Sequence, residues 1–218
     1  MIYSDEFVWL HFPKCAGTKI ENLFKKYYSF DKRIFQDTVD PVLDVQATWH
    51  DSIRDREIRS PNFILGNRII ICSFRRLPAW LESRYSFELQ RSPQLSHRPE
   101  LLLEGKFLEP TGKQNHADAY AKKYLPESIL RSDKIRFIRT EYFEYDFKHV
   151  FGEFLDMTII PSWEFNKKDN VSQSVVPKKI RKQLFKKVLF QGLEQVYEKC
   201  PYWLNVEKIA YQTVPVCY

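Results

Sequence analysis

Short apolar runs and amphipathic stretches alternate along the first half of the chain. Residues 7–12 (FVWLHF) are aromatic or branched and end at Pro13, which predicts a buried strand. After a loop, residues 20–30 carry apolar side chains at helical spacing. Residues 69–72 (IIIC) predict a central strand covered on both faces, and residues 79–89 predict a second helix. This order of elements opens a βαβ unit, so we expect an α/β fold with a mostly parallel sheet.

The second half of the chain has a less regular pattern. Residues 91–114 are rich in proline and charge and lack periodicity, which indicates an inserted loop or a substrate-binding lobe. Residues 115–125 predict a short helix with Asn115 as its N-cap. Residues 134–138 predict a third strand, and a helix over residues 146–155 follows it.

The C-terminal third joins a polar stretch to an amphipathic one. Residues 161–178 predict a polar loop. Residues 177–200 predict the clearest amphipathic helix of the chain, because Ile180, Leu184 and Val188 fall on one stripe. No internal repeat and no Gly/Ser linker interrupts the 218 residues, so the length favours one domain over residues 1–218.

Composition narrows the class of protein. Hydrophobic residues make up 44% and aromatic residues 16% of the chain, which excludes a disordered protein. No apolar run approaches the 18 or so residues that a membrane helix needs, and the first residues do not resemble a signal peptide. The net charge of +6 suits either an anionic partner or simple solubility.

Four cysteines without paired CxxC spacing indicate neither a zinc site nor a disulfide framework. We expect Cys15 and Cys72 to be small, reduced core residues. These observations predict a cytoplasmic protein without a bound metal.

The loop between the first predicted strand and helix carries the first candidate chemistry. The sequence Pro-Lys-Cys-Ala-Gly-Thr-Lys (13–19) brings backbone N–H groups to a helix N-terminus, beside the ammonium of Lys14 and the hydroxyl of Thr18. Such a combination holds phosphate-type anions, although an ordinary turn with a solvated lysine has the same composition. Gly17 is one of only six glycines. The Walker A pattern and an obvious acid for Mg²⁺ are both missing, so we expect protein cations to neutralise the anion.

Two motifs together resemble a known family. Residues 7–24 (FVWLHFPKCAGTKIENLF) resemble the 5′-phosphosulfate-binding loop of sulfotransferases that use 3′-phosphoadenosine 5′-phosphosulfate (PAPS). About 60 residues later, Arg75, Ser83 and Tyr85 follow a strand at the spacing of the family's 3′-phosphate motif. An arginine suits that role because its planar fork forms paired bonds with phosphate oxygens. The family has Arg-Asp-Pro where this chain has Arg-Arg-Leu-Pro, so Arg76 stays an alternative to Arg75.

The resemblance implies a P-loop-like, three-layer α/β/α fold with a mostly parallel central sheet, and residues 91–130 as an acceptor-binding insertion. It implies transfer of a sulfonate from PAPS, without a metal, to a hydroxyl of a carbohydrate or glycolipid. Lys14 would be catalytic, as the cation at the leaving group. The residues that the resemblance assigns to the bound cofactor are Lys14, Cys15, Ala16, Gly17, Thr18, Lys19, Arg75 and Ser83.

A base must also accept the acceptor's proton. His50 is the candidate, because histidine titrates near neutral pH and some carbohydrate sulfotransferases have a catalytic histidine in a comparable segment. His116, in the expected acceptor lobe, and Glu21, one turn into the first helix, are the reserves. His11 ends the first strand and is interpreted as a buried core histidine, although it could line the site.

Further basic residues have open roles. Lys167, Lys168 and Ser172 lie where the family often closes a loop over the nucleotide, and they are equally typical of a solvated charge run. Glu141 is expected to brace a turn. The acceptor and the oligomeric state cannot be read from the sequence; three basic residues of the expected lobe are candidates to meet an anionic acceptor: Arg91, Arg98 and Lys113.

Two other functions compete with the sulfotransferase. One is a nucleotide kinase or triphosphatase with a degenerate phosphate loop, which would depend on a metal. The other is a protein that binds nucleotides or sulfated glycans without catalysis. Nucleic acid is not the expected partner, because no RNA-binding aromatic motif accompanies the basic residues.

Overall fold

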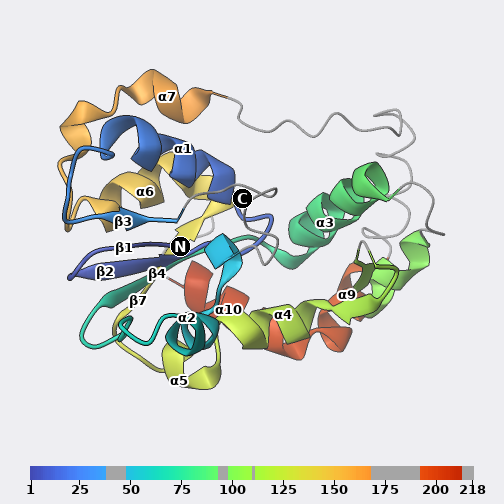
Figure 1. The fold of residues 1–218 in the computed structure, drawn as a ribbon. Helices are drawn as coiled ribbons and strands as arrows, with labels where there is room; N and C mark the ends of the chain where they lie inside the picture. The colour runs from blue at the N-terminus through green and yellow to red at the C-terminus, as the bar shows by residue number, and fades with distance from the viewer. Residues whose placement is uncertain (38–47, 93–97, 110, 168–191, 213–218) are drawn as a thin grey trace. The chain divides into compact units, whose positions relative to one another are not determined.

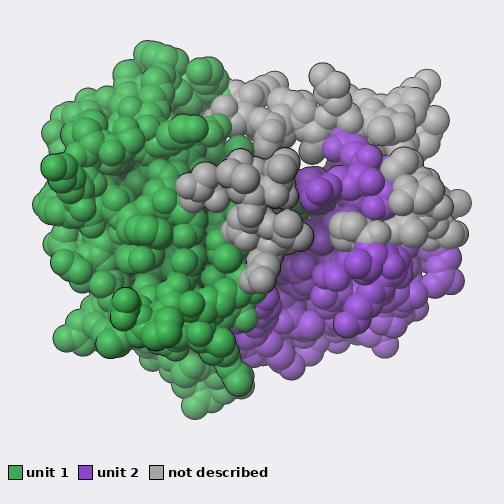
Figure 2. All heavy atoms as spheres, viewed as in Figure 1, with its two compact units in different colours: residues 1–74, 127–170 green, residues 75–126, 171–218 purple. Residues whose placement is uncertain are grey.

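A computed structural model describes residues 1–37, 48–92, 98–109, 111–167 and 192–212 (Figure 1). The chain divides into two compact units, coloured separately in Figure 2. Unit 1 comprises residues 1–74 and 127–170, and unit 2 comprises residues 75–126 and 171–218. The sequence favoured a single domain with an insertion at 91–130; in the structure most of that segment packs with other elements of unit 2.

Unit 1 contains a five-stranded mixed sheet in the order β3-β1-β2-β4-β7. Its strands are β1 (Ile2–Tyr3), β2 (Phe7–Leu10), β3 (Phe35–Gln36), β4 (Ile69–Phe74) and β7 (Ile135–Arg139). The pairs β2–β4 and β4–β7 are parallel, whereas β1 pairs with β2 and β3 in the antiparallel sense. The predicted α/β class is confirmed. The sheet is only partly parallel, because the two-residue strands β1 and β3, too short to leave a periodic pattern, extend it in the antiparallel sense.

The helices α1 (Gly17–Tyr27) and α6 (Phe143–Phe151) cover one face of this sheet (Figure 1). Successive side chains of a strand point to opposite faces, so Phe7 and Trp9 of β2 face the same core. From the helices, this core receives Ile20, Leu23, Phe24, Phe147, Val150 and Phe151. The first predicted helix is confirmed. The helix predicted over 146–155 begins at residue 143 instead, and Asp146 inside it accepts hydrogen bonds from the backbone and guanidinium of Arg139.

The remaining elements of unit 1 are short. They are the 3₁₀ helices η1 (Thr48–His50), η3 (Thr140–Tyr142) and η4 (Met157–Ile159), and the α-helices α2 (Ile53–Arg59), α5 (Glu127–Leu130) and α7 (Ser162–Asn166). The helix α7 lies where a polar loop was predicted, which corrects the first part of that prediction. Its second part, residues 168–178, lies outside the described residues.

Unit 2 is built around an aromatic core. Its elements are α3 (Leu77–Arg91), η2 (Pro99–Glu104), β5 (Lys106–Leu108), β6 (Gln114–His116), α4 (Ala117–Tyr124), α9 (Leu193–Lys199) and α10 (Pro201–Tyr211). Trp80 of α3 packs on Trp203 of α10 with ring centroids 4.6 Å apart. Phe107 also contacts the indole of Trp80. Tilted and edge-to-face aromatic pairs of this kind add to the energy of area burial.

Three predictions for unit 2 change in detail. The stretch 91–114 is not irregular throughout, because β5 pairs with β6 as an antiparallel hairpin. The N-cap of α4 is His116 and not Asn115, since the His116 imidazole accepts a hydrogen bond from the Asp118 backbone. Of the helix predicted over 177–200, residues 177–191 lie outside the described part, and α9 occupies the remainder. In the described part of the chain no helix is both long and apolar enough to cross a bilayer.

Candidate functional site

The loop between β2 and α1 has an unusual backbone conformation. Lys14 and Ala16 adopt φ values of 66° and 62°, in the left-handed region that side chains other than glycine rarely occupy. Ala16 is the N-cap of α1 and makes no side-chain cap to the first helical turn. Strained residues of this kind cluster at binding and catalytic sites, and left-handed turns before a helix form concavities for anions. The loop is therefore a strained turn directly before a helix N-terminus.

A glycine is required at position 17, the first residue of α1, because the side chain of His11 lies close to its Cα atom. A Cβ atom at this position would lie 1.8 Å from Nε2 of His11, well inside contact distance. The imidazole of His11 thus fills the space that a side chain at residue 17 would need. The sequence singled out Gly17 for its backbone, and the structure adds His11 as the reason for the glycine.

Replacing Gly17 with alanine is expected to destabilise the protein by about 1–3 kcal/mol, because the methyl group overpacks against His11. Urea unfolding of the single variants and of Gly17→Ala combined with His11→Ala measures the coupling. The double variant should be more stable than the sum of the single effects predicts. Additive effects would contradict the contact.

Three titratable side chains meet beside this glycine. Nδ1 of His11 lies 2.6 Å from a carboxylate oxygen of Glu21, and both side chains are buried. The rings of His11 and His50 lie 4.2 Å apart, and Trp9 stacks on His11. Burial raises the pKa of Glu21 to about 7 and lowers the pKa of His11 to about 3. A buried group that titrates near neutral pH is typical of functional sites.

A hydrogen bond to the backbone fixes the tautomer of His50. Its Nδ1 lies 3.1 Å from the backbone carbonyl of His11, and a carbonyl can only accept a hydrogen bond. Nδ1 therefore carries the proton, and Nε2 holds the lone pair of the neutral ring. Burial, followed by the neighbouring His11, lowers the pKa of His50 to about 3, so the ring is neutral at physiological pH. The expectation that His50 titrates near neutral pH is therefore wrong, and the buried ring is a weaker base than an exposed histidine.

The structure brings Gly17 of the predicted loop and the two unit 1 candidate bases together around His11. His50 and Glu21 both contact His11, whose ring lies against Gly17 at the end of the loop. The ammonium of Lys19 points elsewhere, because it donates to the backbone carbonyls of Phe165 and Lys167. His11 itself had been interpreted as a core histidine. The burial of His11 agrees with that interpretation, but His11 also contacts Glu21 and His50 and is therefore part of the cluster.

The predicted 3′-phosphate residues belong to unit 2. Arg75 directly follows β4 and Ser83 lies on α3. The guanidinium of Arg76 bonds to the carboxylate of Glu207 at 3.1 Å and stacks on Tyr211. Arg76 is therefore engaged in packing within unit 2.

The other sequence candidates lie apart from the loop or outside the description. His116 is in unit 2 at the start of α4. Glu141 is exposed in η3, and Lys167 is exposed after α7. Lys168 and Ser172 lie outside the described residues.

One group in the described part of the chain has the composition of a metal site. Ligand atoms of His116, Asp118 and Cys200 lie within 4.8 Å of one another. The carboxylate of Asp118, however, accepts the backbone N–H groups of Tyr202 and Trp203 at 2.9 and 2.7 Å, and His116 caps α4. Burial raises the pKa of the Cys200 thiol to about 12. These contacts give the group a structural role in joining α4 to α10. Cys15 and Cys72 are buried, reduced cysteines, as predicted.

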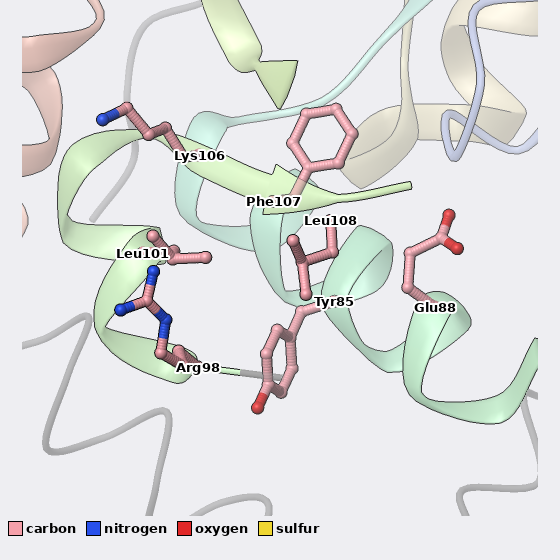
Figure 3. A pocket seen from close by; sticks show the side chains of 7 residues that line it. All are labelled: Tyr85, Glu88, Arg98, Leu101, Lys106, Phe107 and Leu108. Atoms are coloured by element: carbon pink, nitrogen blue, oxygen red, sulfur yellow. The ribbon is translucent and has the colours of Figure 1, made fainter. Parts of the chain in front are cut away.

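Unit 2 also has a hollow in the segment where the acceptor was expected (Figure 3). The recess in Figure 3 is lined by Tyr85, Glu88, Arg98, Leu101, Lys106, Phe107 and Leu108. It adjoins a more polar cavity of about 350 Å³, which shares Arg98, Leu101 and Lys106 and adds Glu100, Glu104 and Gln114. Arg98 lines both hollows, whereas Arg91 is exposed and lies over the ring of Phe87.

The chain was compared with protein-family models, with curated proteins and with solved structures, and it matches none of them. The candidate site is therefore identified from its own residues alone. They are a strained loop at a helix N-terminus and the neighbouring cluster of His11, Glu21 and His50.

Proposed function

We propose that the protein is a sulfotransferase that moves a sulfonate from PAPS to a hydroxyl of a carbohydrate or glycolipid. The observation that carries the proposal is the loop 13–19, where Lys14 and Ala16 hold left-handed conformations directly before α1. The proposal includes the finer fold, a P-loop-like three-layer arrangement. Two features support it: the parallel strands β2 and β4, and the phosphate-type motif that follows each of them.

In the proposed reaction the acceptor oxygen attacks the sulfur of PAPS in line with the bridging oxygen. A new S–O bond forms, the bridging S–O bond breaks, and its electron pair stays on the 5′-phosphate of the released 3′-phosphoadenosine 5′-phosphate (PAP). Nε2 of His50 takes the acceptor's proton, which its tautomer allows. The ammonium of Lys14 stabilises the charge that grows on the leaving oxygen.

The remaining loop residues would bind the donor. Of the amides of residues 16–19 assigned to the 5′-phosphate, those of residues 16–18 suit it together with the hydroxyl of Thr18 at the start of α1, whereas the N–H group of Lys19 donates to the carbonyl of Ala16. Arg75 suits the 3′-phosphate, with Ser83 as its partner in the resemblance. Residues 91–130 stay the expected acceptor-binding segment, and the cavity of about 350 Å³ in unit 2 has a volume and a polar lining that suit a hydroxyl-rich ligand.

The test is a calorimetric titration with PAP in EDTA. We expect the wild type to bind PAP without metal, and Arg75→Ala to bind it about 10- to 100-fold more weakly, since a charge-assisted contact is lost. Arg76→Ala is the matched control. It should keep the affinity within about threefold, because Arg76 is engaged by Glu207 and Tyr211.

The titration separates the competing functions. Binding of ATP only with Mg²⁺, and none of PAP at millimolar concentration, would refute the sulfotransferase and favour a kinase. PAP binding without any sulfonate transfer to glycan acceptors would favour a non-catalytic nucleotide-binding protein. A larger loss in Arg76→Ala than in Arg75→Ala would exchange the roles of the two arginines.

A further inference from the structure

We propose that the His11–Glu21 pair takes up a proton when an anion binds at the loop 13–19, so that anion affinity at this loop is linked to pH. Glu21 is then a positioning residue, which holds the His11 ring against Gly17 and balances the charge of the bound anion. The inference rests on the anion-binding loop of the proposed function, but it does not need sulfonate transfer to occur.

The geometry connects the pair to the loop directly. Nδ1 of His11 and a carboxylate oxygen of Glu21 are 2.6 Å apart, close enough to share one proton. The other ring nitrogen, Nε2, occupies the space next to the Cα atom of Gly17, where the loop becomes α1. A change of charge on the pair therefore changes the electrostatic potential at the first turn of α1, where the anion would bind.

Other charged groups surround the pair from every side. The charge of Lys14, in the loop, lowers the pKa of His11. His50, in η1, lowers the pKa of Glu21. The amino group of Met1 and the carboxylate of Asp37 act on Glu21 from the sheet side, and they bond to each other at 2.9 Å. Burial lowers the pKa of the Met1 amino group below its ordinary value, so this group can also change its charge near neutral pH, and a substitution of Glu21 is needed to separate the contribution of the His11–Glu21 pair.

The direction of the linkage follows from the charges. Above pH 7 the pair carries one negative charge, on Glu21, because burial raises its pKa to about 7 and keeps His11 neutral. Below pH 7 the pair gains a proton and becomes neutral. A bound phosphate disfavours the negative form, so it raises the pKa of the pair, and by reciprocity the affinity falls as pH rises through 7.

The experiment is calorimetry with PAP at pH 7.5 in two buffers of different ionisation enthalpy. If the anion raises the pKa of the pair by about one unit, the wild type takes up about 0.5 proton per PAP bound. The same shift predicts that its dissociation constant rises about five- to tenfold between pH 6.5 and 8.5. Glu21→Gln should lose this proton uptake, and its affinity should no longer fall as pH rises through 7, because its side chain cannot titrate.

Glu164→Gln is the matched control. Glu164 is a buried carboxylate of the same unit, but it bonds to Lys26 and Tyr27. Its substitution should leave the proton uptake unchanged. The pH dependence of the wild type provides a second measurement if Glu21→Gln does not fold.

The outcomes separate this inference from the proposed function. PAP binding with equal proton uptake in the wild type and Glu21→Gln, or with a wild-type affinity constant from pH 6.5 to 8.5, would overturn the inference alone. Proton-linked PAP binding without sulfonate transfer would support the inference and refute the enzyme. No PAP binding by the wild type would overturn both.

Discussion

Replacing His50 with asparagine should lower the rate of sulfonate transfer about 10²- to 10⁴-fold and change the affinity for PAP by less than about threefold. The amide nitrogen of asparagine can replace Nδ1 as donor to the His11 carbonyl, a contact that His50 makes at 3.1 Å. What the variant lacks is Nε2, the atom that would accept the proton. Because the hydrogen bond is retained, a loss of rate reports the missing base and not a disturbed cluster.

The measurement is the release of PAP from PAPS with a mixture of oligosaccharides as acceptors. His149→Asn is the matched control, since His149 is an exposed histidine on α6 that contacts Tyr145 and not the cluster. It should retain the wild-type rate. If His50→Asn also retains that rate, Glu21 becomes the candidate base, and Glu21→Gln should then show the loss.

The loop and its flanking elements could be predicted from the sequence because their signals are local. The aromatic run 7–12 ends at Pro13, and the apolar spacing that follows marks α1. Gly17 was singled out for its place between a strand and a helix, in a chain with few glycines. The pattern does not show why a glycine is needed there, which is that the ring of His11 lies against the Cα atom of Gly17.

The cluster beside the loop was not predicted as a cluster, although its members were named separately. His11 follows a strand of buried apolar residues, so its neighbours indicated a core position. One available signal was Glu21, which sits one residue after Ile20 and three before Phe24 on the face of α1 that becomes buried. A carboxylate on a buried face needs a partner, but the sequence does not show that the turn brings His11 there.

The antiparallel strands illustrate a different limit. β1 and β3 have two residues each, and their pairing with each other is set by backbone contacts between segments more than 30 residues apart. A two-residue strand has no detectable alternation, so the mixed sheet could not be distinguished from a parallel one. The N-cap of α4 was misassigned by one residue because both Asn115 and His116 carry side-chain acceptors.

Lys14→Gly should change stability and activity in opposite directions. Lys14 has a φ of 66°, which glycine adopts without strain, so the variant should raise the free energy of unfolding by about 1 kcal/mol. The same variant removes the cation at the leaving oxygen, and we expect the transfer rate to fall about 10²- to 10³-fold. A strained residue that is retained at the expense of stability is typical of a functional position.

Two further variants separate the effect of backbone strain at residue 14 from the effect of the Lys14 charge. Lys14→Met removes the charge and keeps the left-handed conformation, so its transfer rate should fall as in Lys14→Gly while its free energy of unfolding stays near that of the wild type. Ala16→Gly, at a φ of 62°, should raise the free energy of unfolding by a similar amount without removing a cation. Urea unfolding and PAP release measure the two quantities. A Lys14→Gly protein that keeps the wild-type rate would refute the leaving-group role of Lys14, and one that is less stable than Lys14→Met would show that the loop is not strained at this residue.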